Sequence, residues 1–335
     1  MQIVSLVLLF TALFAACENE IPFHPGTKAP QLLMNAVLTA GKAENEVRLK
    51  IIENDESRHV SNGSVTVYVN GEKTETADAF IQSASWHDTI KICLLKTPFL
   101  PGDRVRLDAT AEDDRFHVSS EVRIPMPVTE ALRVDTFLTQ LKVGYYMQKC
   151  MRYKITIQDR PDENNYYQLM ILNNEYWGDP DAGWEYPPSV MYQEIINQED
   201  IVLTDGHLTT ADDEEYGNID MAIRNKNNVF TDNRFKNTSY TLKVYTQYFD
   251  YYNYGEENHM VVEADIRLIS LTEAYYRYLR VMNCLDSDNY NPTFMEPLLL
   301  PCNVKGGLGF VGAVSEKQIS VRIVDRPPLR PKQIN

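Results

Sequence analysis

A glycine-rich run near residue 310 comes closest to a known ligand-binding motif. Gly307-Leu-Gly309-Phe-Val-Gly312 has the G-x-G-x-x-G spacing that lets a backbone approach a dinucleotide pyrophosphate. Such a site also needs a preceding strand, a following helix and an acidic residue about 20 positions further on. Only 23 residues follow Gly312, and three of them are prolines. We therefore expect these glycines to lie in a strand or bulge that packs closely against neighbouring backbone.

No other group of polar residues has the spacing of a catalytic or metal site. The six histidines are scattered, and the sequence contains no Gly-x-Ser-x-Gly elbow and no Walker loop. Residues 212–217 resemble half of a calcium loop but lack the alternating oxygen ligands and the closing Glu, so a solvated acidic turn is expected there. The sequence thus predicts no enzyme activity, no metal and no cofactor. A hydrolase with an unrecognised site is the less favoured alternative.

Two loops rich in Tyr and Trp are the best candidates for contact with a ligand or partner. One surrounds the sequence Asp-Pro-Asp-Ala-Gly at 179–183, and the other, at 250–259, is expected to be the tip of a hairpin. Aromatic side chains give a large contact area at a low entropy cost. The alternative is that the rings only cover edges of the protein's own core. The candidate binding residues are Trp177, Trp184, Tyr186, Tyr251, Tyr252 and Tyr254.

The N-terminus has the features of an export signal. Residues 1–16, MQIVSLVLLFTALFAA, carry no charge and contain an apolar run that is too short to span a membrane but typical of a signal peptide. The segment Leu-Phe-Ala-Ala-Cys17 resembles a bacterial lipobox, in which the cysteine is lipidated; an ordinary signal peptide with a chance cysteine is the alternative. Residues 17–30, with three prolines and a glycine in 21–30, are expected to form a flexible tether.

Composition limits the classes of partner. The chain of 335 residues has 47 acidic and 32 basic residues, a net charge of −15, which argues against nucleic-acid binding. Hydrophobic residues make up 44% and charged residues 24%, as in folded globular proteins. Twenty tyrosines favour β structure.

Three further residues are candidates for covalent chemistry. None of the cysteines has C-x-x-C spacing, and Cys284 and Cys302 are a candidate disulfide, although sequence does not fix connectivity. Cys93 is expected to be buried. Asp88-Thr89-Ile90 resembles a short O-glycosylation signal of exported bacterial proteins, which makes Thr89 a candidate glycosylation site.

The elements that must position these residues are mainly strands. Short alternating strands about ten residues apart predict an N-terminal Ig-like β-sandwich over 31–127, ending at Pro125-Met126-Pro127. A larger β-sandwich-like domain is expected over 128–325, followed by a tail at 326–335. It contains one α-helix at about 270–285, for which Ser270 and Glu273 form a capping box.

A series of motifs runs through the whole mature chain. In the C-terminal third, Leu271-Thr-Glu-Ala-Tyr275-Tyr276 is followed by Asn291-Pro292, Glu296-Pro297 and the glycine-rich run; Pro101-Gly102-Asp103 and Asn165-Tyr166-Tyr167 lie upstream. Together with the lipobox, this series resembles the Bacteroidetes lipoprotein family catalogued as domain of unknown function 4249. The acidic sequence Glu18-Asn19-Glu20 also resembles the signal that exports such lipoproteins to the outer face of the outer membrane.

The resemblance implies a surface lipoprotein, often encoded near TonB-dependent outer-membrane receptors, with no established activity and no catalytic residues to transfer. The expected protein is therefore a surface-exposed outer-membrane lipoprotein. Its expected role is that of a non-catalytic binding subunit accessory to a TonB-dependent transporter, with an unknown ligand. An adhesin or a structural cell-surface protein is the alternative.

Overall fold

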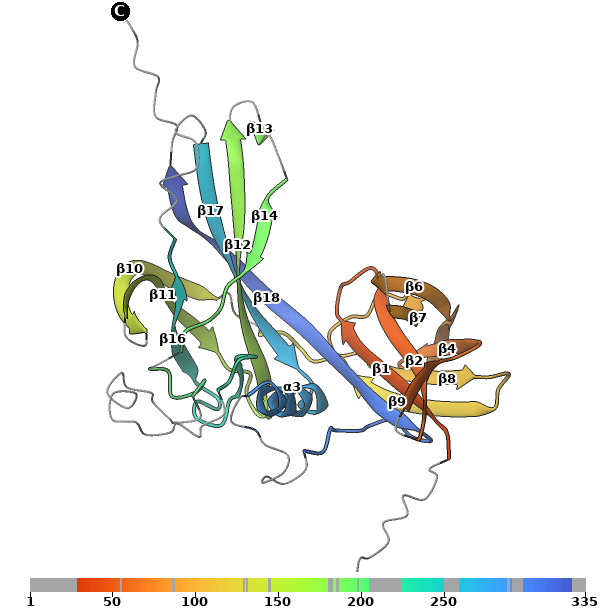
Figure 1. Ribbon diagram of the computed structural model, residues 1–335. Coiled ribbons are helices and arrows are strands. Elements are labelled where there is room, and N and C mark those ends of the chain that lie inside the picture. The colour runs from red at the N-terminus through yellow and green to blue at the C-terminus, as the bar shows by residue number, and fades with distance from the viewer. Residues whose placement is uncertain are drawn as a thin grey trace, which may run out of the picture.

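The computed structural model describes residues 29–326, apart from 55, 86–87, 129, 131, 144–145, 180–182, 185–186, 198, 205–223, 250–258, 288–289 and 291–297. The described part of the chain is mainly β, with a single helix, as the sequence predicts. Figure 1 shows one long sheet that runs through the molecule, with smaller sheets packed on it.

An eleven-stranded sheet forms the centre of the fold. Its main path is β13 (Gly183–Trp184), β12 (Tyr166–Asp179), β17 (His259–Leu271), β18 (Leu308–Arg326), β1 (Gln31–Thr39), β2 (Asn45–Glu53), β7 (Asp88–Leu95) and β6 (Phe80–Ser85). Two short strands, β14 (Ser189–Tyr192) and β15 (Val229–Thr231), also pair with β12, and β3 (Glu56–His59) pairs with β2.

The long strand β18 joins the two halves of this sheet. Its first part pairs in parallel with β1, from Leu33 opposite Leu308 to Thr39 opposite Val314. Its remaining part pairs antiparallel with β17. Val314 has a partner on both sides, Thr39 and Leu271, so the change of partner occurs at this residue.

The N-terminal sandwich consists of the β1 half of the long sheet and a four-stranded sheet. The smaller sheet has the order β5 (Glu72–Asp78), β4 (Gly63–Val69), β8 (Arg104–Ala111) and β9 (Phe116–Arg123). A sandwich is thus present where the sequence predicts one. Its core, however, also contains Val304, Val311 and Ala313. The sandwich therefore does not end at residue 127, because β18 supplies part of its core from the other end of the chain.

The second half of the long sheet packs against a three-stranded sheet. That sheet has the order β10 (Arg133–Val143), β11 (Tyr146–Gln158) and β16 (Ser239–Gln247). Alternate residues of β18 contribute to both sandwiches: Val311 and Ala313 lie in the first core, and Ile319 and Val321 pack against the second. Both small sheets consequently cover the same face of β18.

Helix α3 (Glu273–Leu285) covers the opposite face of the long sheet at the junction of the two halves. Tyr278 stacks on Phe310 of β18, with ring centroids 5.0 Å apart and an interplanar angle of 3°. The predicted helix is confirmed, but its predicted cap is wrong. Ser270 still belongs to β17 and pairs with Ser315, so the N-cap is Thr272, whose hydroxyl accepts a hydrogen bond from the Ala313 amide.

The predicted hairpin over 239–269 is also wrong. β16 pairs with β11 in the three-stranded sheet, whereas β17 lies between β12 and β18 in the long sheet. β17 is buried along both faces, which is typical of a central strand with two neighbours. The segment 250–258 therefore connects two different sheets.

The glycine-rich run opens β18, so no helix follows it and the dinucleotide fingerprint is excluded. A Cβ on Gly307 would lie 2.3 Å from the Leu32 carbonyl oxygen. A Cβ on Gly309, which has a φ of +111°, would lie 2.2 Å from the Met34 carbonyl oxygen. Only glycine allows this close parallel approach of β1 and β18, as the sequence predicts.

We predict that Gly309→Ala lowers the free energy of unfolding by at least about 2 kcal/mol, because the methyl group adds a backbone clash to the strain of a positive φ. Gly41→Ala is the matched control, since Gly41 has a φ of +72° but nothing within 4 Å of its Cβ position. Urea denaturation of the chain that follows Cys17 measures both variants. Equal losses in the two variants would show that the approach to β1 is not the constraint.

Candidate functional site

The strands that lead into the two predicted aromatic segments pair with each other at one end of the long sheet. Gly178 of β12 pairs with Trp184 of β13 on one side and with His259 of β17 on the other. Met260, the next residue of β17, pairs with Arg326 at the end of β18. We call this group of strand ends, formed by 176–179, 183–184, 259–263 and 322–326, the distal end (upper part of Figure 1).

The structure describes two of the candidate aromatic residues, and both lie on strands of this distal end. Trp177 lies on β12 opposite Met260 and is half-buried, and the backbone of Trp184 forms β13. The segment that holds three of the predicted tyrosines, 250–258, leads directly into His259. Four candidates lie outside the described residues: Tyr186, Tyr251, Tyr252 and Tyr254. The two aromatic segments are far apart in the sequence, but one follows β12 and the other precedes β17, and these two strands are neighbours in the sheet.

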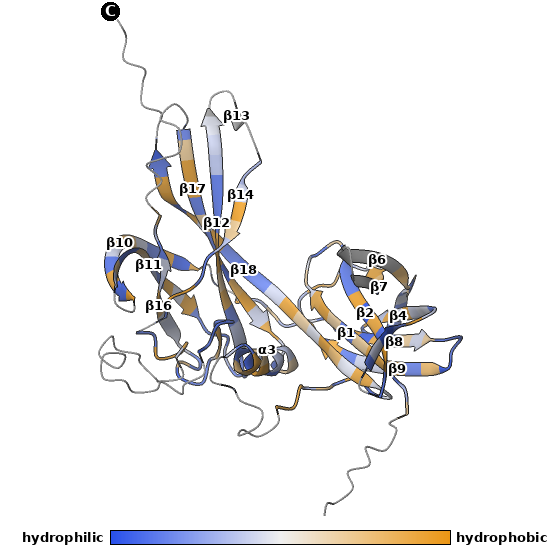
Figure 2. Cartoon of the chain, in the orientation of Figure 1, coloured by the Kyte–Doolittle hydropathy of each residue, from blue (hydrophilic) through white to orange (hydrophobic). Residues whose placement is uncertain are grey.

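An exposed apolar edge strand adjoins the distal end and was missed by the sequence analysis. In the described part of the chain, β14 pairs with β12 alone. Its side chains are unusually exposed for their type: Val190 is 53% exposed, Met191 38% and Tyr192 73%. Figure 2 shows this hydrophobic strand along the edge of the sheet. The available signal was the short apolar run Val-Met-Tyr that follows Pro187-Pro188 and Ser189.

Charged side chains connect the ends of β17 and β18 at the same place. His259 Nε2 lies 2.7 Å from an Asp325 carboxylate oxygen, and Arg322 donates to the other oxygen of Asp325 at 3.0 Å. Arg322 also lies 3.5 Å from Glu263. The hydrogen bonds from His259 and Arg322 lower the pKa of Asp325 below its usual value. These contacts link the side chains of the two strand ends.

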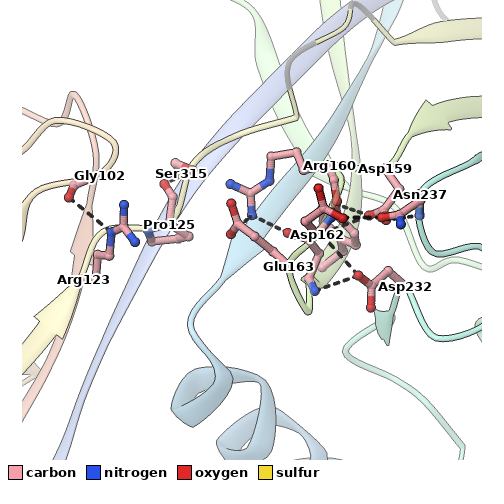
Figure 3. A network of polar contacts seen from close by, with 12 residues as sticks. Gly102, Arg123, Pro125, Asp159, Arg160, Asp162, Glu163, Asp232, Asn237 and Ser315 are labelled. Atoms are coloured by element: carbon pink, nitrogen blue, oxygen red, sulfur yellow. Dashed lines mark hydrogen bonds and ion pairs between the residues drawn. The ribbon is translucent and has the colours of Figure 1, made fainter.

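Buried titratable groups are concentrated elsewhere, at the turns next to β11, β12 and β15. One carboxylate oxygen of Asp159 accepts hydrogen bonds from the Tyr167 hydroxyl at 3.0 Å and from Asn165 at 3.1 Å. The other oxygen accepts the Asn237 amide at 2.9 Å. Asp232 accepts the backbone amide of Asn165 at 2.9 Å. Figure 3 shows Asp159, in the turn after β11, beside Asn237, in the segment that precedes β16.

This network contains the residue types of an acid–base site, but a substrate has no access to them. Asp159 is 3% exposed and Asp232 is 1% exposed, so a substrate cannot reach either carboxylate. Burial raises the pKa of Asp159, against the lowering effect of its hydrogen bonds from Asn237 and Tyr167. Burial also raises the pKa of Tyr167, which acts here as a hydrogen-bond donor. The network therefore locks turns together rather than binding a substrate.

One protein family matches nearly the whole chain. The family described as domain of unknown function (DUF4249) matches residues 18–320. The protein belongs to this family. No curated protein is similar enough to the chain to count as a relative. The DUF4249 match covers both sandwiches, helix α3 and most of β18, so the shared strand is part of the family domain.

The structure also describes several of the cysteines and the candidate glycosylation site of this DUF4249 protein. The predicted disulfide is not formed: Cys284 lies on α3, Cys302 is exposed in the segment before β18, and both are free thiols. Cys93 is buried as predicted. Thr89 lies in β7, opposite Ser83 of β6. Cys17 and the acidic run 212–217 lie outside the described residues.

The described residues contain no group of three or more His, Cys, Asp or Glu side chains that could hold a metal ion. No helix among them has the length and apolar character needed to cross a membrane.

The lowered pKa of Asp325 predicts a pH dependence. Because the carboxyl is more acidic in the folded state than the unfolded value of about 3.9, its stabilising effect is complete above that value and is lost as pH falls through the folded pKa. The effect is small, about 0.2–1 kcal/mol, since the pair is exposed. In urea denaturation, we expect Asp325→Asn to be less stable than the native chain at pH 6 and equally stable near pH 2.5. A difference that grows on acidification would contradict this assignment.

Proposed function

We propose that this DUF4249 protein is a lipoprotein on the outer face of the outer membrane and a non-catalytic binding subunit accessory to a TonB-dependent transporter. In this proposal the distal end and β14 form the surface that contacts the transporter or its ligand. The observation that carries the proposal is the pairing of β12 and β17, the strands attached to the two aromatic segments, at one end of a single sheet, beside an exposed apolar edge strand.

The position of that surface supports a role away from the membrane. Leu33, near the start of the described chain, pairs with the first residue of β18, whereas the distal end includes its last residue. A strand of 19 residues is about 60 Å long. With lipid on Cys17, the tether of residues 17–30 would lead to one end of β18 and leave the distal end pointing to the opposite side.

The chemistry of the surface supports binding. An edge strand offers unpaired backbone groups, and exposed Val, Met and Tyr side chains offer apolar area, so a partner can add both main-chain hydrogen bonds and side-chain contacts. The carboxylates of Asp159 and Asp232 lie in a buried structural network, out of reach of a substrate.

Lipid anchoring supports a partner in the same membrane. A common membrane and a short tether raise the effective concentration of two proteins for each other, so a modest interface is sufficient for stable association. β14 offers exposed apolar side chains on both faces of this edge, Val190 and Tyr192 on one face and Met191 on the other.

We predict that Tyr192→Ser reduces the amount of transporter recovered by affinity purification of the tagged protein from detergent-solubilised membranes at least about fivefold, because interface Tyr residues often contribute more than 1 kcal/mol. Leu100→Ser is the matched control, since Leu100 is 63% exposed on a turn of the other sandwich, and it should leave recovery unchanged. Absence of any transporter with the native protein, together with full growth of a deletion strain on all nutrients tested, would favour the adhesin alternative.

We predict that Cys17→Ser moves the protein from the membrane fraction to a soluble fraction, because a lipid chain would then be absent. Fractionation followed by immunodetection measures this shift, and intact-mass analysis of the native protein should show the added lipid. Continued membrane attachment of the Cys17→Ser protein would contradict lipid anchoring.

A further inference from the structure

A polar cavity lies on the N-terminal sandwich, far from the distal end along β18. It has a volume of about 570 Å³ and opens on the face of β4, β8 and β9 that points away from the core. Two turns close one side of it, at Asn70-Gly71 and at Gly102. Its lining is Tyr68, Asn70, Gly71, Gly102, Arg104, Arg106, Glu121 and Arg123.

The charge in this cavity is opposite to that of the chain as a whole. Three arginines and one glutamate line it in a protein whose net charge is −15. Arg104 of β8 lies directly opposite Arg123 of β9 in the strand register. Like charges directly opposite each other destabilise a sheet, so this pair costs stability unless an anion lies between or beside the two side chains.

The protein's own carboxylates neutralise this pair only in part. Arg104 lies 3.4 Å from Glu121, and both side chains are more than half exposed, at 72% and 54%. Arg123 donates only a long hydrogen bond, 3.4 Å, from Nε to the Gly102 carbonyl oxygen (Figure 3). Each guanidinium has five N–H donors, so most donors of these two residues are free to face a ligand.

The third arginine is held in place by an aromatic ring. The Arg106 guanidinium carbon lies 4.0 Å from the centre of the Tyr68 ring, and the side chain also contacts Asp108 at 3.2 Å. Stacking on a ring fixes the plane of a guanidinium and leaves its edge available for hydrogen bonds. Arg106 is therefore preorganised on one wall of the cavity, whereas Arg104 and Arg123 are exposed and can adjust their side chains to a ligand.

We propose that this cavity binds an acidic saccharide, whose carboxylate or sulfate group is held between Arg104 and Arg123. Paired guanidinium groups match such anions bidentately. The polar lining suits a ligand rich in hydroxyl groups, and the volume suits a molecule of about two sugar units. This site is separate from the proposed transporter contact and does not depend on it.

Isothermal titration calorimetry of the full chain after Cys17 tests the proposal at low ionic strength. The probes are a sulfated uronate disaccharide and digalacturonate, with cellobiose as the neutral control and sodium sulfate as the isolated anion. We expect both acidic disaccharides to bind, cellobiose to bind at least tenfold more weakly, and affinity to fall as salt is added. Sodium sulfate should also bind at least tenfold more weakly than the disaccharides.

Arg104→Ala and Arg123→Ala should each weaken disaccharide binding at least fivefold. Arg48→Ala is the matched control, because Arg48 is likewise an exposed strand arginine beside a glutamate, at 3.5 Å from Glu46, and it should have no effect. Because Arg104 and Arg123 repel each other, neither cavity variant should unfold at a lower urea concentration than the native chain. Equal affinity for cellobiose, equal affinity for sulfate alone, or an equal loss in Arg48→Ala would each overturn the proposal.

Discussion

The pairing of β18 with two partners is the constraint on which the rest of the structure depends. Its first third must approach β1 closely enough that Gly307 and Gly309 have no room for a side chain, and the remainder must pair with β17. The amide of Phe310 bonds to the side chain of Asn35, 275 positions earlier in the sequence. Contacts of such separation form late and slowly, so neither sandwich can complete its core until almost the whole chain is available.

This constraint also fixes the geometry of the two halves. A hinge between consecutive domains would normally lie at 124–128, where β9 leads to β10. Here β18 runs past that connection, and the Ser315 hydroxyl donates to the Pro125 carbonyl oxygen at 2.7 Å. On the other face, Tyr275 and Tyr278 of α3 stack on Phe310. The connection is therefore fixed by a strand on one side and a helix behind it.

Local patterns in the sequence predict the mainly β class and the single helix of the described residues, because alternation and helical spacing depend on neighbouring residues. They could not predict partners. The strands at 239–247 and 259–271 look like a hairpin from their spacing, but double-sided burial places β17 in the centre of another sheet. Ser270 has the type and spacing of a cap, yet β17 continues through it. The pairing of β12 with β17 joins residues about 90 positions apart, so no local signal predicts it.

The buried polar groups stabilise the fold, whereas other, exposed side chains are available to a partner. Asp159, Asp232 and Asn165 use their hydrogen-bonding capacity on one another and on backbone amides, out of reach of solvent. The arginines of the N-terminal cavity and the apolar side chains of β14 do the opposite, since they are exposed and incompletely matched by their neighbours. Because β18 runs through both sandwiches, these two surfaces are held at a fixed separation. A ligand in the cavity and a partner at the distal end could then be bound together without a conformational change, which is a role for a scaffold rather than for a switch.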